Sequence, residues 1–332
     1  MKVLVTGASG FVGSAVVRAL LGQGSSVKAL VRSTSLLDNL CDLDVERVTG
    51  DLRDAQSLER ALQGCELAFH VAADYRLWVP DPEVMYDINV RGSERLLRAA
   101  ASAGVERVVY TSSVATLGFS PAGPADEDTP VDEKHIIGHY KQTKFLAEQT
   151  VRRTADELGL PLIIVNPSSP FGPGDIKPTP TGQIVLDTLC GRMPAFVDTG
   201  LNVCHVDDIA QGHLLALEHG RVGERYILGG ENLTLEAILG LIADAAGLRR
   251  PSIRIPNGVA MIAAVAAETW SRVAGGEPRI TRDAVRMARR KMYFSSRKAR
   301  EELGFAPRPA KVAIEDAVHW FSKQRASTEL SA

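Results

Sequence analysis

Residues 1–20 read MKVLVTGASGFVGSAVVRAL, an apolar run followed by three glycines, Gly7, Gly10 and Gly13. The apolar run predicts a buried strand, and residues 13–23 predict a helix that packs on it. In such a strand–turn–helix unit the first glycine permits the tight turn, the second lets the backbone approach a pyrophosphate, and the third lets helix and strand pack closely. The GxxGxxG spacing at the start of the chain therefore predicts a dinucleotide site at the helix N-terminus.

Short β-rich runs alternate with helix-like stretches along the first two thirds of the chain. This alternation predicts an α/β fold of the Rossmann type, in which helices cover both faces of a doubly wound parallel sheet. We expect strands at 3–5, 26–31, 47–48, 67–71, 107–111, 162–165 and 225–228. We expect helices at 13–23, 57–62, 89–103 and 140–157.

The rhythm changes after residue 167, because NPSSPFGPGDIKPTPTG (166–182) is dense in Pro and Gly. Such a stretch is unsuited to regular helix or interior strand, and we expect a loop that can serve as a lid. The next helix begins at HVDDIA, with Asp207 or Asp208 as its expected cap.

Three parts of the chain follow from this pattern. The dinucleotide-binding Rossmann domain is expected at 1–170 plus about 203–230. A smaller, mostly helical substrate lobe with a short SIRIP strand is expected at about 171–202 plus 231–324, and a disordered tail at 325–332.

The composition argues for a globular protein and against several other classes. Lys and Arg number 38 against 40 Asp and Glu, a formal net charge of -2, so no strong positive field is available to hold nucleic acid. The 4 cysteines show neither metal-ligand pairs nor the density of a disulfide scaffold. We therefore expect no metal site, no nucleic-acid partner and a reducing, cytoplasmic compartment, and no secretory signal is recognisable.

The longest apolar stretch is VAMIAAVAAETW, residues 259–270, which includes Glu268 and is too short to span a bilayer. We expect a packed helix here. A helix lying on a membrane surface is the alternative, and with it a position at the periphery of the inner membrane.

Tyr140 and Lys144 stand four residues apart on a predicted helix, so their side chains share one face. A tyrosine near its reference pKa of about 10 is a poor base at neutral pH, but an adjacent ammonium favours the phenolate. Ser112 and Ser113 follow the end of a predicted strand, on the side where open α/β sheets bind their ligands. A hydroxyl placed there can donate a hydrogen bond to a substrate oxygen.

The second strand ends at Arg32, at the position where an acidic residue would bind the ribose hydroxyls of NAD. An arginine there can accommodate a 2′-phosphate, so NADP(H) is favoured and NAD(H) remains possible. The alternative is that Arg32 is an ordinary solvated side chain. Asp51 can accept a hydrogen bond from the adenine amine, or it can cap the helix that begins near Asp54.

Seven motifs together resemble an extended short-chain dehydrogenase/reductase of the NAD-dependent epimerase/dehydratase type: TGASGFVG, GDLRD, FHVAA, DINVRGSERLL, YTSSVATLG, YKQTK and HVDDIA. The resemblance implies that Ser113, Tyr140 and Lys144 form a catalytic triad, that Lys144 also binds the nicotinamide ribose, and that Asn89 supports the active-site helix. A homodimer that forms through the helix carrying Tyr140 is a further possibility that the resemblance implies. The implied cofactor-binding residues are Gly7, Ser9, Gly10, Phe11, Val12, Gly13, Arg32, Asp51, Leu52, Ala72, Ala73, Tyr140, Lys144, Pro167 and Ser169.

Within that family, VAADYRLWVPDPE, IGHYK, NPSSPFGPGDIKPTPTG and YILGGENLT most resemble hopanoid-associated sugar epimerases, which are close to the dihydroflavonol reductases. The resemblance implies a sugar-like or hopanoid-linked small-molecule substrate. Arg32 favours a net NADPH-dependent reductase, whereas the Asn-Pro pair at 166–167 favours an epimerase. A non-catalytic NADP sensor is the alternative from another class.

Several other side chains are candidates for contact with the substrate. Tyr75, Arg76, Trp78 and His139 can line a pocket, although aromatic packing between lobes explains the tyrosine and tryptophan equally well. A substrate diphosphate can be clamped by Arg192, Arg282 or Arg286, and the sequence does not choose among them. For His205 we favour a structural hydrogen bond over catalysis.

Overall fold

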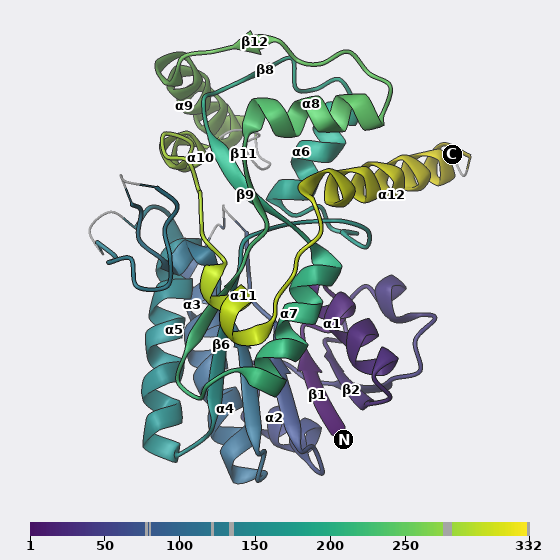
Figure 1. Cartoon of the computed structure of the whole chain (residues 1–332), viewed down its shortest axis with the longest axis vertical. Coiled ribbons are helices and arrows are strands. Elements are labelled where there is room, and N and C mark those ends of the chain that lie inside the picture. The colour runs from purple at the N-terminus through teal and green to yellow at the C-terminus, as the bar shows by residue number, and fades with distance from the viewer. Residues whose placement is uncertain (77–78, 80, 121–122, 133–135, 275–280, 331–332) are drawn as a thin grey trace.

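A seven-stranded parallel sheet forms the centre of the computed structural model, which describes residues 1–332 except 77–78, 80, 121–122, 133–135, 275–280 and 331–332 (Figure 1). Its strand order is β10-β6-β5-β4-β1-β2-β3. The strands are β1 (Lys2–Thr6), β2 (Ser26–Val31), β3 (Glu46–Thr49), β4 (Leu67–His70), β5 (Arg107–Thr111), β6 (Leu162–Pro167) and β10 (Arg225–Leu228). Every strand predicted for this sheet is present, and the Rossmann-type fold is confirmed.

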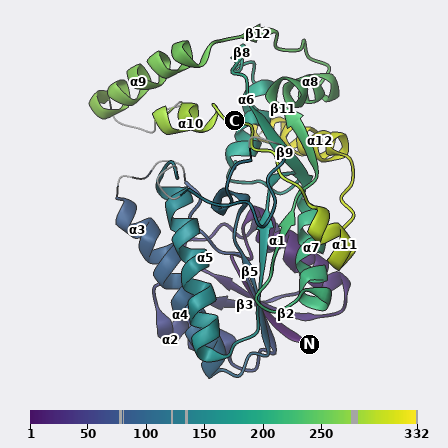
Figure 2. The same ribbon diagram turned by 60° about the vertical axis from the view of Figure 1, so that its left-hand side comes forward.

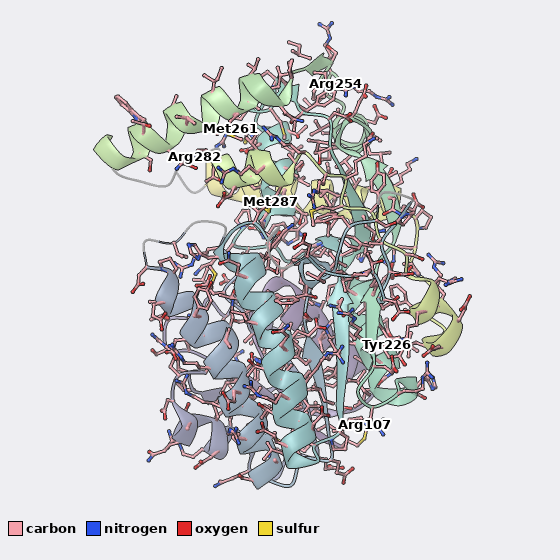
Figure 3. All side chains as sticks on the ribbon, turned by 90° about the vertical axis from the view of Figure 1, so that its left-hand side faces the viewer. Arg107, Tyr226, Arg254, Met261, Arg282 and Met287 are labelled. Carbon is pink, nitrogen blue, oxygen red and sulfur yellow. The ribbon has the colours of Figure 1, made fainter. Side chains whose placement is uncertain are left out.

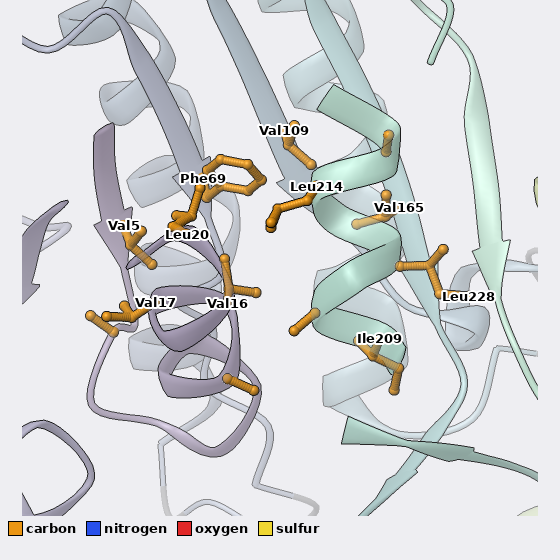
Figure 4. Packing of buried hydrophobic residues seen from close by; sticks show 14 of the residues in the cluster. Val5, Val16, Val17, Leu20, Phe69, Val109, Val165, Ile209, Leu214 and Leu228 are labelled. Atoms are coloured by element: carbon orange, nitrogen blue, oxygen red, sulfur yellow. The ribbon is translucent and has the colours of Figure 1, made fainter. Parts of the chain in front are cut away.

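Helices cover both faces of this sheet because each face is lined by aliphatic side chains that must leave water. One face packs against α1 (Phe11–Gly22), α7 (Val206–His219) and α11 (Arg297–Leu303). Figure 4 shows Val16 and Leu20 of α1 and Leu214 of α7 meeting sheet residues such as Phe69. The other face packs against α2 (Ala55–Leu62), α4 (Gly92–Ser102) and α5 (His139–Leu158).

The segment between β4 and α4 forms α3 (Pro82–Tyr86) and a π-helical turn, η2 (Asp87–Arg91). Short 3₁₀ turns, η1 (Asp38–Leu40) and η3 (Val114–Thr116), follow β2 and β5.

A second lobe stands at the carboxyl ends of the parallel strands (Figure 2). One of its two parts is the three-stranded sheet β11-β9-β7 packed on α6 (Pro180–Leu189), α8 (Leu235–Ala245) and α12 (Ala310–Leu330). These strands are β7 (Ser169–Phe171), β9 (Gly200–His205) and β11 (Glu231–Thr234). The other part is the pair β8 (Ala195–Phe196) and β12 (Ile253–Arg254) with α9 (Asn257–Ala274) and α10 (Arg282–Met287).

The boundaries of the lobes differ from expectation in two places. Ala299, Leu303 and Phe305 are buried in the Rossmann core, so residues 297–305 return to the first domain although the sequence assigned them to the second. Helix α12 continues to Leu330, whereas the sequence predicted a disordered tail from residue 325. The position of residues 297–305 depends on contacts with elements far away in the sequence. The end of α12 depends on the continuation of the helix from one residue to the next.

The Pro/Gly-rich stretch 166–182 is more regular than predicted. Asn166 and Pro167 belong to β6, which lies between β10 and β5, so the exclusion of interior strand was wrong for these two residues. Pro167 is the last residue of that strand, where its missing N–H removes at most one bond from the ladder. Residues 169–171 form an edge strand and Pro180 begins α6.

Candidate functional site

The turn between β1 and α1 requires glycine at two positions. Gly7 has φ +68°, and a Cβ there would lie 2.7 Å from the backbone nitrogen of Ala72. A Cβ at Gly13 would lie 2.0 Å from the carbonyl oxygen of Gly7, so the helix can approach the turn only without a side chain. Gly10 is exposed and caps α1 with no side-chain hydrogen bond, and the first helical turn has no acidic residue. This cradle of backbone amides fits a dinucleotide pyrophosphate.

The ends of β2 and β3 bring Arg32 and Asp51 to the same edge of the sheet. The hydrogen bond from Arg53 lowers the pKa of the Asp51 carboxyl, and the charge of Arg32 adds to that shift. Helix α2 is capped by Asp54, whose Oδ1 accepts from the N–H groups of Gln56 and Ser57. Asp51 therefore does not cap the helix, and the alternative that the sequence left open for it is wrong.

The other expected cofactor contacts fall into two groups. Phe11, Leu52 and Pro167 are buried, whereas Ser9, Val12, Ala73 and Ser169 are partly exposed. Ala72 donates its N–H to Thr6 Oγ1 at 3.2 Å, which fixes the loop after β4 against the glycine turn.

Part of the Pro/Gly-rich stretch lies across the glycine turn. The Asn39 amide donates to the carbonyl oxygen of Ser9 at 3.3 Å and to that of Gly174 at 2.9 Å. The Tyr75 hydroxyl donates to the carbonyl oxygen of Lys177 at 3.3 Å. These contacts place the predicted lid segment beside the turn at the start of α1.

Ser113, Tyr140 and Lys144 come together at the carboxyl end of β5. Ser113 caps η3 by accepting the Ala115 N–H at 3.1 Å. Burial raises the pKa of Tyr140, and a hydrogen bond with the Ser113 side chain opposes that shift. Lys144 is 3% exposed, and its Nζ donates to the carbonyl oxygen of Thr111 at 2.8 Å.

Lys144 is held in a buried position at the end of β5. Burial lowers the pKa of Lys144 to about 8, and the charge of Glu148 opposes this shift. The stabilisation of a Tyr140 phenolate by this ammonium stays a prediction.

Glu148, which the sequence analysis missed, lies beneath this site with 4% of its surface exposed. Its Oε2 accepts hydrogen bonds from Ser112 at 2.5 Å, Thr116 at 2.9 Å and Asn166 at 3.1 Å. Burial alone would raise the pKa of Glu148, but the Ser112 bond and nearby arginines hold it below its usual value. The only sequence signal was the spacing, since Glu148 stands one turn after Lys144 on α5.

Asn89 joins the loop after β4 to α5, the helix that carries Tyr140 and Lys144. Its Oδ1 accepts from the N–H of Asp74 at 2.7 Å, and its Nδ2 donates to the Asp74 carbonyl at 2.9 Å and to Thr143 Oγ1 at 3.0 Å. Thr143 in turn donates to the carbonyl oxygen of Tyr140 at 2.9 Å. These hydrogen bonds tie Asn89 to the start of α5, and its role in an active site stays a prediction.

His70 is a second buried group that the sequence analysis missed. It is fully buried, and its ring nitrogens lie 2.8 Å from Thr6 Oγ1 and 2.9 Å from Ser93 Oγ. Burial, with a smaller effect of the Lys144 charge, lowers the pKa of His70 to about 3. The imidazole is therefore neutral and connects β1 to α4 through hydrogen bonds.

Two of the residues proposed to contact the substrate make contacts within the chain. His139 packs edge-on against Tyr86 with ring centroids 6.3 Å apart. Arg76 pairs with Asp74 at 2.5 Å, and Trp78 lies outside the described residues.

The three candidate phosphate clamps face carboxylates. Arg192, Arg282 and Arg286 lie 4.0, 2.6 and 3.2 Å from the carboxylates of Asp187, Glu268 and Asp283 respectively. Figure 3 labels Arg282 and Met287 on α10, which packs against α9.

His205 is structural, as favoured. Its Nδ1 accepts the N–H of Asp207 at 3.0 Å, and its Nε2 lies 3.1 Å from Asp316 Oδ2. His205 is therefore the cap of α7, and the expectation that Asp207 or Asp208 caps it was wrong. Asp208 instead accepts hydrogen bonds from Arg308.

The described residues show neither a metal cluster nor a membrane-spanning helix. Among these residues no group of three or more His, Cys, Asp or Glu side chains is placed to hold a metal ion. No helix in the described part of the chain has the length and apolar character needed to cross a membrane.

The fold and this site define a Rossmann-type nucleotide-dependent enzyme class, and comparison with known proteins specifies it further. The model of the NAD dependent epimerase/dehydratase family matches residues 3–229. The chain belongs to this family, the extended short-chain dehydrogenases/reductases.

Similar proteins carry several different names. The chain is 46% identical to "Putative dihydroflavonol 4-reductase" of Synechocystis sp., over 96% of this chain and 93% of that protein. It is 36% identical to "Sterol demethylase protein B" of Methylococcus capsulatus, over 98% and 99%.

Solved structures match over nearly the full length. The crystal structure of gox2253 has a TM-score of 0.87 and 52% identity, covering 97% of this chain and 98% of that one. PA4631, a nucleoside-diphosphate-sugar epimerase from Pseudomonas aeruginosa, has a TM-score of 0.80 and 28% identity, covering 98% of each chain. The family thus includes relatives named both as reductases and as epimerases.

Proposed function

We propose that the protein is an NADP(H)-dependent oxidoreductase that acts at a secondary alcohol or carbonyl carbon, as a net ketoreductase. The observation that carries the proposal is that the Ser113 side chain lies close enough to Tyr140 to act on its pKa, with Lys144 buried one turn further along α5. The glycine turn of the same sheet edge supports dinucleotide binding. Arg32, exposed at the end of β2, supports the preference for NADP(H).

The proposed mechanism assigns a separate task to each side chain. When bound, the nicotinamide supplies or accepts a hydride at the substrate carbon. The hydroxyls of Ser113 and Tyr140 bind the substrate oxygen, and Tyr140 moves the proton between its own oxygen and that atom. Lys144 stabilises the phenolate after the proton has left. Asn89 and Glu148 act as positioning residues through the hydrogen bonds that hold α5 and the β5 end.

Tyr140→Phe tests the assignment, because it removes the proton-carrying oxygen and keeps the ring. We expect turnover of ketone substrates to fall by about 10²–10⁴-fold, while NADP(H) affinity stays within about twofold of the wild type. Tyr226→Phe is the matched control, since it also deletes one hydroxyl. This hydroxyl lies away from the site and donates a hydrogen bond to Glu302 at 2.9 Å. Substantial turnover by Tyr140→Phe would show that the proton comes from another group.

An epimerase is the second candidate, favoured by the Asn166–Pro167 pair at the end of β6 and by the similarity to PA4631. An epimerase returns its cofactor to the starting state in each cycle, whereas a net reductase consumes one NADPH for each product. Stoichiometric loss of NADPH absorbance with product formation therefore separates the two. A non-catalytic NADP sensor would bind the nucleotide and show neither reaction.

We propose a sugar-like or hopanoid-linked substrate. The support is the resemblance of the motifs around 71–83 and 166–182, together with relatives named for a sterol and for a nucleoside-diphosphate sugar. Turnover of a polycyclic lipid ketone but not of a nucleotide sugar would favour the hopanoid-linked class, and the reverse result would favour the sugar-like class.

Helix α9 is the basis for a proposed contact with the membrane surface. Val259, Ile262 and Trp270 are 53%, 73% and 72% exposed, and they share a helical face with Ala263 and Ala266. Residues 249–291 contain ten Lys and Arg but three Asp and Glu, in a chain whose formal net charge is -2. An apolar helix face within a basic region is complementary to a bilayer with anionic headgroups.

A further inference from the structure

Two cations flank one aromatic ring beside the proposed site. Lys141 Nζ lies 5.4 Å from the centroid of the Phe119 ring, and the guanidinium carbon of Arg290 lies 5.1 Å from the same centroid. Phe119 follows Ser113 and the η3 turn, Lys141 directly follows Tyr140, and Arg290 comes from the second lobe just after α10. The cluster therefore joins both lobes next to the hydroxyl groups that are proposed to bind the substrate oxygen.

Among the residues that the structure describes, no acidic side chain balances the charge of this cluster. Lys141 is 8% exposed, and burial together with the charge of Arg290 lowers the pKa of Lys141 to about 8. Within the described part of the chain, no carboxylate lies at ion-pair distance from Lys141 or Arg290. The attraction of a cation to an aromatic ring is too weak to replace a full counter-charge.

Other cations near this cluster do have acidic partners. Arg282 and Arg286 pair with Glu268 and Asp283, and Lys291 lies 3.9 Å from Asp198. Asp283 also stands near the active-site helix, because a Cβ on Gly138 would be 3.8 Å from its Oδ2. That carboxylate nevertheless pairs with Arg286.

We propose that Lys141 and Arg290 bind an anionic group of the substrate, a carboxylate or a phosphate, at the Phe119 ring beside Tyr140. A bound anion would supply a counter-charge that no described residue provides to these two cations, and the guanidinium can bind it with two hydrogen bonds. Because Lys141 is the neighbour of Tyr140 on α5, the anion would fix the position of the reacting carbon relative to the tyrosine hydroxyl. This inference rests on the proposed function, since it describes the substrate of the same site.

The test compares three small ketones that share one ring, measured by isothermal titration calorimetry on the full chain saturated with NADP⁺. The probes are 4-acetylbenzoate, 4-acetylphenyl phosphate and the neutral 4-acetylbenzamide. We expect the wild type to bind one or both anions at least tenfold more tightly than the amide. Preference for only one anion identifies the group as a carboxylate or a phosphate.

Variants then test which side chains carry the preference. Lys141→Met and Arg290→Met should each reduce it at least fivefold, Lys141→Arg should retain most of it, and the neighbouring Lys291→Met should leave it unchanged. Equal affinities for anions and amide, or a preference that survives both methionine variants, would overturn the proposal. Tyr140→Phe should lose turnover and keep the anion preference, so a failure of the catalytic assignment would be seen in turnover and a failure of the anion site in the calorimetry.

Discussion

Two regions near the carboxyl ends of the parallel strands differ in how densely they are packed: the ends of the strands themselves, and the helices α9 and α10 of the second lobe. On the cofactor side, Thr6, His70, Asn89 and Glu148 are buried and hydrogen-bonded, and backbone atoms approach so closely that glycine is required. On the other side, α9 and α10 share a small core that contains Ala260, Ala264 and Val285. The difference shows that the ends of β1, β4 and β5 are held by a dense network of buried contacts, whereas α9 and α10 are held by few.

The largest effect is expected at the glycine turn. Gly13→Ala would force a Cβ to within 2.0 Å of a backbone oxygen, so we expect unfolding free energy to fall by about 3 kcal/mol or more. Gly22→Ala in the same helix is the control, because nothing lies within 4 Å of the added Cβ, and it should be neutral or stabilising. Urea denaturation of both variants measures the difference, and equal stabilities would contradict the close approach.

The buried carboxylate beneath Ser113 should have the next largest effect. Glu148→Gln removes a charge that faces Arg225 at 3.2 Å and Arg152 at 3.3 Å, and we expect a loss of about 3 kcal/mol. Turnover should fall while substrate KM changes little, because the turn that carries Ser113 loses its anchor. Glu157→Gln on the same helix removes an exposed carboxylate and should change stability by about 0.5 kcal/mol or less. A Glu148→Gln variant as stable as Glu157→Gln would show that the network is not needed.

The buried imidazole predicts a loss of stability in acid. The pKa of His70 is about 3 in the folded chain and about 6.5 when exposed, so the unfolded chain binds the extra proton between these values. Stability is therefore full above about pH 6.5 and falls as the pH decreases, by about 2 kcal/mol between pH 7 and pH 5. His70→Gln should flatten this part of the pH profile of unfolding free energy, and the exposed His219→Gln should not. An unchanged slope in His70→Gln would mean that another group, such as buried His213, controls the transition.

The smallest stability effect is expected on α9. Ile262→Ser changes a side chain that is 73% exposed, so unfolding free energy should change by about 0.5 kcal/mol or less. Binding to vesicles of anionic phospholipid should nevertheless weaken clearly, measured by flotation and by the fluorescence of Trp270. Vesicle binding that is equal in the wild type and the variant would exclude α9 as the contact surface.

Most of the frame could be predicted from the sequence, because its signals are local. Alternating apolar runs gave the strands, and the glycine spacing gave the turn that Gly7 and Gly13 form. Caps were less predictable, since His205 and not a neighbouring aspartate closes the start of α7. A cap depends on backbone torsion angles and side-chain direction, and composition alone does not specify either.

The candidate site shows the same division. The four-residue spacing of Tyr140 and Lys144 indicated a shared helix face. The cluster of Lys141, Arg290 and Phe119 could not be predicted in this way, because its members come from three separate segments. Likewise, the sequence offered Arg192, Arg282 and Arg286 as phosphate clamps, and only the structure shows a carboxylate beside each.

By itself, the sequence determined the class of fold, the glycine turn after β1 and the shared helix of Tyr140 and Lys144, because each depends on periodicity or spacing within a short stretch of chain. The tertiary structure decided which charges are paired, which polar groups are buried, and that residues 297–305 return to the first domain. Those properties depend on distances between segments far apart in the chain, and they are set when the two lobes pack together.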